Sequence, residues 1–65
     1  MKVLLKEIRT KKRLSLRQLE YMTGIPRSTL SDIENHHVPF TLEAAEIIAK
    51  GLHMKISELY DSEYK

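Results

Sequence analysis

Apolar residues recur at intervals of three and four along most of this chain, which is the period of an α-helix. Leu5 and Ile8, with Leu4 beside them, form the first such face and predict a helix over residues 3–12. The last apolar group predicts a short helix over residues 56–60. No segment carries a strand signal, so the pattern predicts five short helices and an all-α fold.

Local signals mark the second helix. Ser15 and Gln18 have the spacing of a capping box, in which each side chain binds the backbone N–H of the other residue. Gly24 predicts the end of this helix, because glycine readily takes the left-handed conformation of a helix stop. The expected hydrophobic side of the helix consists of Leu16, Leu19 and Met22.

The third helix is short and mostly polar. Pro26 suits its start, where a missing N–H does no harm. At 100° per residue, Leu30 and Ile33 point one way together with Pro26, and we expect this side to face the core. The opposite arc, which is available for binding, carries Arg27, Ser28, Ser31, Asp32 and Asn35.

Thr41 is the expected N-cap of a fourth helix that follows a turn over residues 36–40. Glu43 is favourable in its first turn, where the helix dipole attracts negative charge. The expected buried side of this helix consists of Leu42, Ala45, Ile48, Ala49 and Leu52.

Length and composition restrict the remaining choices. A chain of 65 residues has room for one domain and one core, here about residues 4–60 with a short tail over residues 61–65. It contains no cysteine, so neither disulfides nor thiolate metal sites can stabilise it. No apolar run is long enough for a membrane span, and no signal-peptide pattern is present. We therefore expect a cytoplasmic, non-membrane protein.

The net charge of +2 is unevenly distributed. Residues 1–32 carry eight bases and three acids, a balance of +5, whereas residues 33–65 carry three bases and six acids, a balance of −3. The first half should therefore attract a polyanion. A plain solvated surface is the alternative interpretation.

The short connection around Gly24 is typical of a helix-turn-helix. Leu19, Leu30 and Ile33 stand where that motif needs interior residues. Over about residues 5–60 the sequence resembles the lambda-repressor-like, Cro/repressor-type helix-turn-helix family, also called the xenobiotic-response-element type. The resemblance is carried, in family order, by LSLRQL, TGIPRSTLSDIEN, PFTLEAAEIIAKGL and ISELY.

The resemblance implies a compact five-helix domain that binds double-stranded DNA and regulates transcription, with repression as the expected outcome. The family's base-reading positions fall on Arg27, Ser28 and Asp32. The Arg27 guanidinium suits bidentate recognition of guanine, and a phosphate contact is the alternative. Asp32 could accept a hydrogen bond from cytosine or could serve to reject other sequences.

Phosphate contacts are expected from the flanks of the recognition helix. The candidates are Arg17, Thr29, Ser31 and Asn35. The basic run over residues 11–13 could reach the backbone at the edge of the footprint, or could simply be solvated.

Within the resemblance, Arg9 and Glu34 match two positions that commonly form a structural salt bridge. Other positions depart from the family pattern. Leu16 replaces a glutamine that often binds phosphate, so we expect no DNA contact from it. Glu20 replaces a small residue and should lean outward or pair with a base such as Arg27 or Arg13.

Backbone strain is expected at Arg13 and His53, where relatives often have glycine in a left-handed turn. His36 and His37 are adjacent, but two ligands without a third make a weak metal site, so no metal is expected. Either histidine could instead touch phosphate when it is protonated, and simple exposure to solvent is the alternative.

A homodimer that binds an inverted repeat is expected from the same family pattern. The candidate contacts are Ile56, Tyr60 and Tyr64, although Tyr60 could merely close the monomer core. No catalytic constellation is visible, so we expect neither an enzyme nor a cofactor, and no small-molecule ligand is evident. The alternative function is a protein-binding module on the same fold, such as an antirepressor or an antitoxin component.

Overall fold

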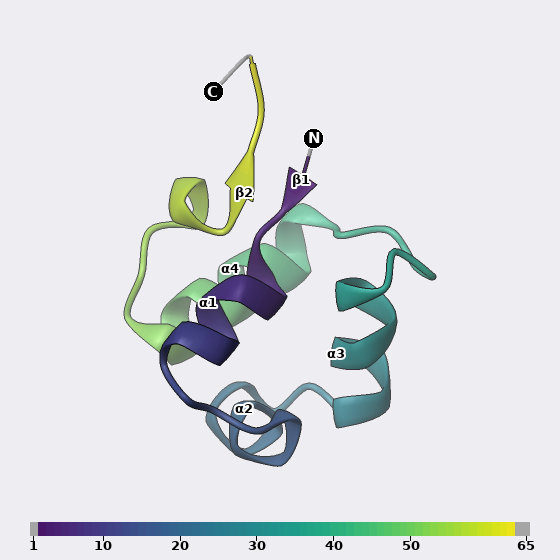
Figure 1. Cartoon of the computed structure of the whole chain (residues 1–65), viewed down its shortest axis with the longest axis vertical. Helices are drawn as coiled ribbons and strands as arrows, with labels where there is room; N and C mark the ends of the chain where they lie inside the picture. Colours follow the sequence, from purple (N-terminus) through teal and green to yellow (C-terminus); the bar gives the residue numbers. More distant parts are fainter. Residues whose placement is uncertain (1, 64–65) are drawn as a thin grey trace.

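The computed structural model of this chain describes residues 2–63. Within these residues the chain forms four α-helices and one 3-10 helix, joined by short turns (Figure 1). Their bounds are α1 (Leu5–Lys11), α2 (Leu16–Thr23), α3 (Arg27–Glu34), α4 (Leu42–Leu52) and the 3-10 helix η1 (Ile56–Glu58). Two short strands complete the described chain, β1 (Lys2–Val3) and β2 (Tyr60–Asp61).

The helical signals around α2 are confirmed. Gln18 N–H donates to Ser15 Oγ at 3.0 Å, and Ser15 N–H donates to Gln18 Oε1 at 2.7 Å, which completes the capping box. Gly24 closes the helix in the left-handed conformation, with φ of 78°. Thr41 likewise caps α4, since its hydroxyl accepts from the backbone N–H of Ala44 at 3.1 Å.

The expectation of five helices and no strand is wrong. The last expected helix, over residues 56–60, is only one 3-10 turn over residues 56–58. The backbone N–H of its N-cap residue, Lys55, donates to Glu58 Oε1 at 2.9 Å. After that turn, residues 60–61 pair antiparallel with residues 2–3 in the register Lys2↔Asp61 and Val3↔Tyr60. The backbone groups of residues 2–3 and 60–61 bond to each other, so neither the first nor the last expected helix can extend into these residues.

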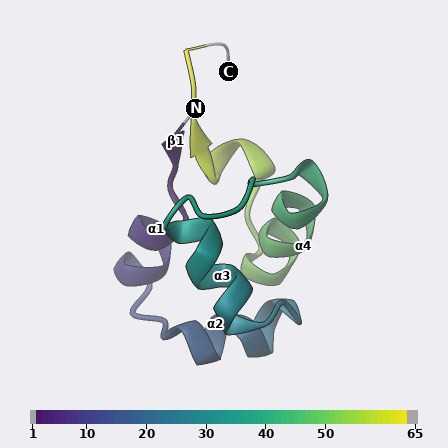
Figure 2. The same cartoon turned by 90° about the vertical axis from the view of Figure 1, so that its right-hand side faces the viewer.

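The first helix begins at Leu5 rather than at residue 3, because Val3 belongs to this strand pair. Leu4 N–H donates to the carbonyl of Leu59 at 2.8 Å and continues the contact. The two strands lie at the opposite end of the molecule from α2 in both views (Figures 1 and 2). Two residues are too few to show the alternating polar and apolar pattern of a strand. These strands can therefore be recognised only in the folded chain, where the two distant segments pair.

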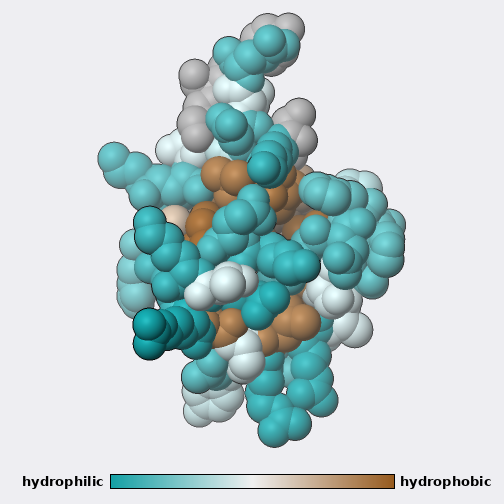
Figure 3. Space-filling view, viewed as in Figure 1, coloured by the Kyte–Doolittle hydropathy of each residue, from teal (hydrophilic) through white to brown (hydrophobic). Residues whose placement is uncertain are grey.

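All helices contribute to one hydrophobic core. Leu19 and Leu30, from α2 and α3, are fully buried, as their spacing predicted. On the face shown in Figure 3 the surface is mostly hydrophilic, and hydrophobic side chains reach it mainly in two separate areas. The buried residues are Leu5, Leu19, Leu30, Ile33, Ala45, Ile48, Ala49, Leu52 and Leu59.

Three residues expected on the core side are exposed. Leu42 is 68% exposed because it is the first residue of α4, and the helix face there extends beyond the packed core. Met22 is 41% exposed at the end of α2, just before the chain turns at Gly24. Pro26 is exposed as the N-cap of α3, before the helix has turned its side chains toward the core.

Gly51 allows α4 to approach the end of α2 closely. A Cβ atom at this position would lie 2.9 Å from the carbonyl oxygen of Met22 and 3.0 Å from Cγ2 of Thr23. Any larger residue would therefore push the two helices apart. Because α3 follows α2 after a short turn, this contact also helps to place α3.

Candidate nucleic-acid interface

Helix α3 is presented by a helix-turn-helix. Residues 24–26 connect α2 to α3, and the left-handed Gly24 reverses the chain direction. Pro26 then acts as N-cap with φ of −54°, so α3 starts at Arg27. Leu30 and Ile33, which are 0% and 3% exposed, bury one side of the helix against the core. Figure 2 shows α3 on the side that faces the viewer, in front of the rest of the fold.

The first turn of α3 is open to solvent. Arg27, Ser28 and Thr29 are all exposed. Within residues 2–63, the Arg27 side chain makes neither a hydrogen bond nor an ion pair. Its guanidinium is therefore free to act as a donor toward an external ligand.

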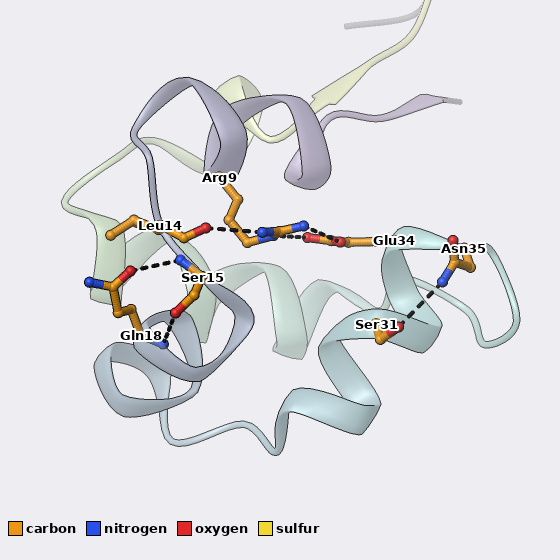
Figure 4. A network of polar contacts seen from close by, with 7 residues as sticks. All are labelled: Arg9, Leu14, Ser15, Gln18, Ser31, Glu34 and Asn35. Atoms are coloured by element: carbon orange, nitrogen blue, oxygen red, sulfur yellow. Dashed lines mark hydrogen bonds and ion pairs between the residues drawn. The ribbon is translucent and has the colours of Figure 1, made fainter.

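Asp32 and Ser31 lie one turn further along the helix and are half-buried. Asn35 Nδ2 donates to Ser31 Oγ at 3.3 Å, which links the C-cap residue to the helix (Figure 4). The Asp32 carboxylate lies 3.5 Å from Nδ1 of His37. This contact between α3 and the following turn was not expected from the sequence.

A second group of polar side chains surrounds the start of α2. Arg17 is exposed in the first turn, next to the capping box. The basic run of Lys11, Lys12 and Arg13 is also exposed, and Arg13 has the expected left-handed conformation, with φ of 58°. These four residues are half of the eight bases in residues 1–32.

Arg9 connects three parts of the fold. Its Nε donates to Glu34 Oε2 at 2.7 Å, its Nη2 donates to Glu34 Oε1 at 3.1 Å, and its Nη1 donates to the carbonyl of Leu14 at 3.0 Å (Figure 4). The bidentate pair joins α1 to the last turn of α3, and the third bond joins both to the turn before α2.

The ion pair is largely shielded from water. The side chains of Arg9 and Glu34 are 17% and 4% exposed. The hydrogen bonds to Glu34 raise the pKa of Arg9 above its ordinary value; burial opposes this rise, and the negative charge of Glu34 adds a smaller increase. The pair therefore holds α3 at a fixed position relative to α1 and lies behind the exposed arc rather than on it.

The positions that depart from the family pattern are accommodated without a new ion pair. Leu16 is half-buried and packs against the core, so its side chain offers no hydrogen bond to a ligand. Glu20 is half-buried, and among the described residues it pairs with neither Arg27 nor Arg13. His53 is left-handed as expected, with φ of 56°, and His36 adopts the same conformation, with φ of 60°, which was not expected.

Two of the three expected dimer residues lie beside an apolar hollow. Ile56 and Tyr60 are half-buried, and they line the hollow together with Phe40, Leu42 and neighbouring residues of α4. Tyr64 lies outside the described residues. Leu42 was missed as a surface residue because its helical spacing matches that of the core positions.

The described residues contain no group of three or more histidine, aspartate or glutamate side chains placed to hold a metal ion. None of the helices over residues 2–63 has the length and apolar composition needed to cross a bilayer.

The helix-turn-helix family matches the chain over residues 5–59, which include α1 through η1. The chain therefore belongs to this family, in its Cro/repressor-type branch, and the resemblance read from the sequence is confirmed. Members of this class are regulators that bind double-stranded DNA. Neither a curated protein nor a solved structure matches the chain significantly.

Proposed function

We propose that this protein is a sequence-specific transcriptional repressor that reads the major groove of its operator with α3. A repressor of this size acts by occupying DNA that the transcription machinery needs. The observation that carries the proposal is the position of Arg27, which is exposed and unpaired at the start of a helix whose other side is buried through Leu30 and Ile33.

Base recognition is assigned to Arg27, Ser28 and Asp32. In a helix-turn-helix, residues near the N-terminus of the second helix reach base edges. The free guanidinium of Arg27 can donate two hydrogen bonds to guanine, a contact that contributes about 1 to 3 kcal/mol of discrimination. Ser28 is less selective, because a hydroxyl can both donate and accept.

Phosphate binding is assigned to the polar groups around this arc, which are Arg17, Thr29, Ser31 and Asn35. The hydrogen bond from Asn35 occupies a lone pair of the Ser31 oxygen, so the Ser31 hydroxyl remains able to donate to a phosphate. Arg17 stands beside the first turn of α2, whose free backbone N–H groups favour an anion. These contacts would fix the position of α3 on the duplex.

The proposed active form is a homodimer on an inverted repeat. The hollow lined by Ile56, Tyr60, Phe40 and Leu42 supports this form, because it is apolar and includes a leucine that is 68% exposed. A two-fold dimer would set half-sites about ten base pairs apart.

Selection of bound duplexes from a random pool tests the proposal. The wild-type protein should enrich one inverted repeat, and Arg27→Ala should lose the preference at one base pair in each half-site. Lys6→Ala is the matched control, because it removes an equal charge from α1 and should leave the selected sequence unchanged. Enrichment of no sequence at low salt would contradict the proposal.

The salt dependence of the affinity separates this function from protein binding on the same fold. A protein that neutralises phosphates loses DNA affinity with a log–log slope of about −0.9 per phosphate. We expect a slope that corresponds to several phosphates per protomer. A slope near zero would favour the protein-binding module instead.

A further inference from the structure

The end of α3 fixes the position of His37. The backbone N–H of His36 donates to the carbonyl of Ile33 at 3.2 Å, and that of His37 donates to the carbonyl of Asp32 at 2.8 Å. With His36 left-handed at φ of 60°, these two bonds form a Schellman motif. The backbone of His37 is therefore hydrogen-bonded to the last turn of α3, at Asp32 itself.

The His37 side chain faces the same residue. Its Nδ1 lies 3.5 Å from Asp32 Oδ1, which is longer than the usual N–H···O hydrogen bond of about 2.7 to 3.2 Å. The attraction between the two groups therefore depends mainly on whether the imidazole is charged. The C-terminal end of a helix also favours a positive charge at this place.

Other charged groups near this end of α3 are already engaged or lie elsewhere. From α1, Arg9 reaches this end of α3, and its guanidinium is held by Glu34. His36 is the other titratable group of the turn. Among the described residues, Asp32 is the acid that has an atom within 4.0 Å of the His37 ring nitrogens. Both side chains keep contact with solvent, at 67% exposure for His37 and 48% for Asp32, so protons can exchange freely.

We propose that His37 is a specificity-determining residue that acts through Asp32, so that base discrimination at the position Asp32 faces weakens as the pH falls. This inference rests on the proposed function, in which Asp32 faces the base pairs. When His37 is neutral, the Asp32 carboxylate is free to accept a hydrogen bond from a cytosine amino group and to reject other sequences. A protonated His37 attracts the carboxylate and draws it toward the turn. Histidine is the side chain that changes charge between about pH 5 and pH 8.

The test compares duplex affinities at pH 8 and pH 5.5 at constant salt. One probe is the selected operator. The other probes are duplexes that differ from it only at the base pair whose selection changes in the Asp32→Asn variant. For the wild-type protein we expect the ratio of these affinities to be about two- to fivefold larger at pH 8, the range expected for an exposed ion pair. An unchanged ratio would overturn the inference. If all duplexes bound more tightly at pH 5.5 by the same factor, the protonated histidine would be a phosphate contact instead.

Three variants assign the effect to the pair. His37→Gln should keep the pH 8 discrimination at both pH values, and His37→Arg should show the pH 5.5 discrimination at both. Asp32→Asn should discriminate weakly at both. A wild-type pH profile in His37→Gln would overturn the inference.

The neighbouring histidine supplies the matched control. His36→Asn keeps a residue that tolerates the left-handed conformation, and it should retain the wild-type pH profile. Loss of the profile in this variant would overturn the assignment to His37.

Thermal unfolding of each variant at both pH values verifies that the fold is intact. Failure to select any operator would overturn the proposed function as well, whereas selection with a pH-independent preference would overturn this inference alone.

Discussion

The two sides of α3 differ in what their residues bind. The inner side carries Leu30 and Ile33, which are buried, and Glu34, whose carboxylate is held by Arg9. The outer side consists of the exposed residues of α3 and begins in the first turn with Arg27, which has no partner within the described residues. The inner side can hold the helix firmly because its contacts are internal, and the outer side can bind an external ligand because its donors are not used. Changes on the two sides should therefore have separable effects on stability and on DNA binding.

The largest effect is expected at the core. Leu30→Ala removes a fully buried side chain and should lower the free energy of unfolding by about 2 to 5 kcal/mol, because it leaves a cavity. Urea unfolding followed by circular dichroism measures this change. Leu30→Met is the control, since a volume-conserving change should cost less than about 1.5 kcal/mol. A loss below 1 kcal/mol in Leu30→Ala would show that the inner side does not anchor α3.

A somewhat smaller loss is expected at the ion pair. Arg9→Ala leaves the shielded Glu34 carboxylate without its partner and should lower the free energy of unfolding by about 2 to 3 kcal/mol, somewhat less than for a fully buried pair. Urea unfolding again measures the change. The double variant Arg9→Met with Glu34→Leu should recover most of the loss, because it removes both charges. Unchanged stability in Arg9→Ala would mean that the pair does not brace α1 against α3.

The smallest effect on stability is expected on the outer side. Arg27→Ala should change the free energy of unfolding by less than about 0.5 kcal/mol, because the side chain is exposed and unpaired. The same variant should bind the selected operator about 5- to 150-fold more weakly, as expected for the loss of a bidentate base contact. Fluorescence anisotropy with labelled duplexes measures the affinity. An equal loss on operator and random DNA would identify Arg27 as a phosphate contact instead.

Local signals in the sequence predicted the helix-turn-helix well. The capping box at Ser15 and the left-handed stop at Gly24 involve residues no more than four apart, so their chemistry can be read directly. The buried positions Leu19, Leu30 and Ile33 also followed from helical spacing. Arg27 is exposed because it stands in the first turn of α3, whereas helical spacing alone places it about 60° from Leu30.

Contacts between distant segments could not be predicted in this way. The pairing of residues 2–3 with residues 60–61 shortened the last expected helix to one 3-10 turn, and it depends on a meeting of the two ends of the described chain. The exposure of Leu42 depends on where the core ends, although its spacing matches that of buried neighbours. The close approach of Gly51 to α2 also exists only in the packed molecule.

The sequence by itself determined which segments become helices, where most of them begin and end, and which arc of α3 is polar, because caps, turns and helical periodicity act within a few residues. Only the tertiary structure decided how firmly α3 is held, and only the folded turn after α3 decided which group Asp32 faces. Arg9 reaches Glu34 across 25 positions of the chain, and the turn after α3 folds His37 back toward Asp32. The first contact depends on the packing of whole helices, and the second depends on a left-handed turn at His36 that no glycine marks in the sequence.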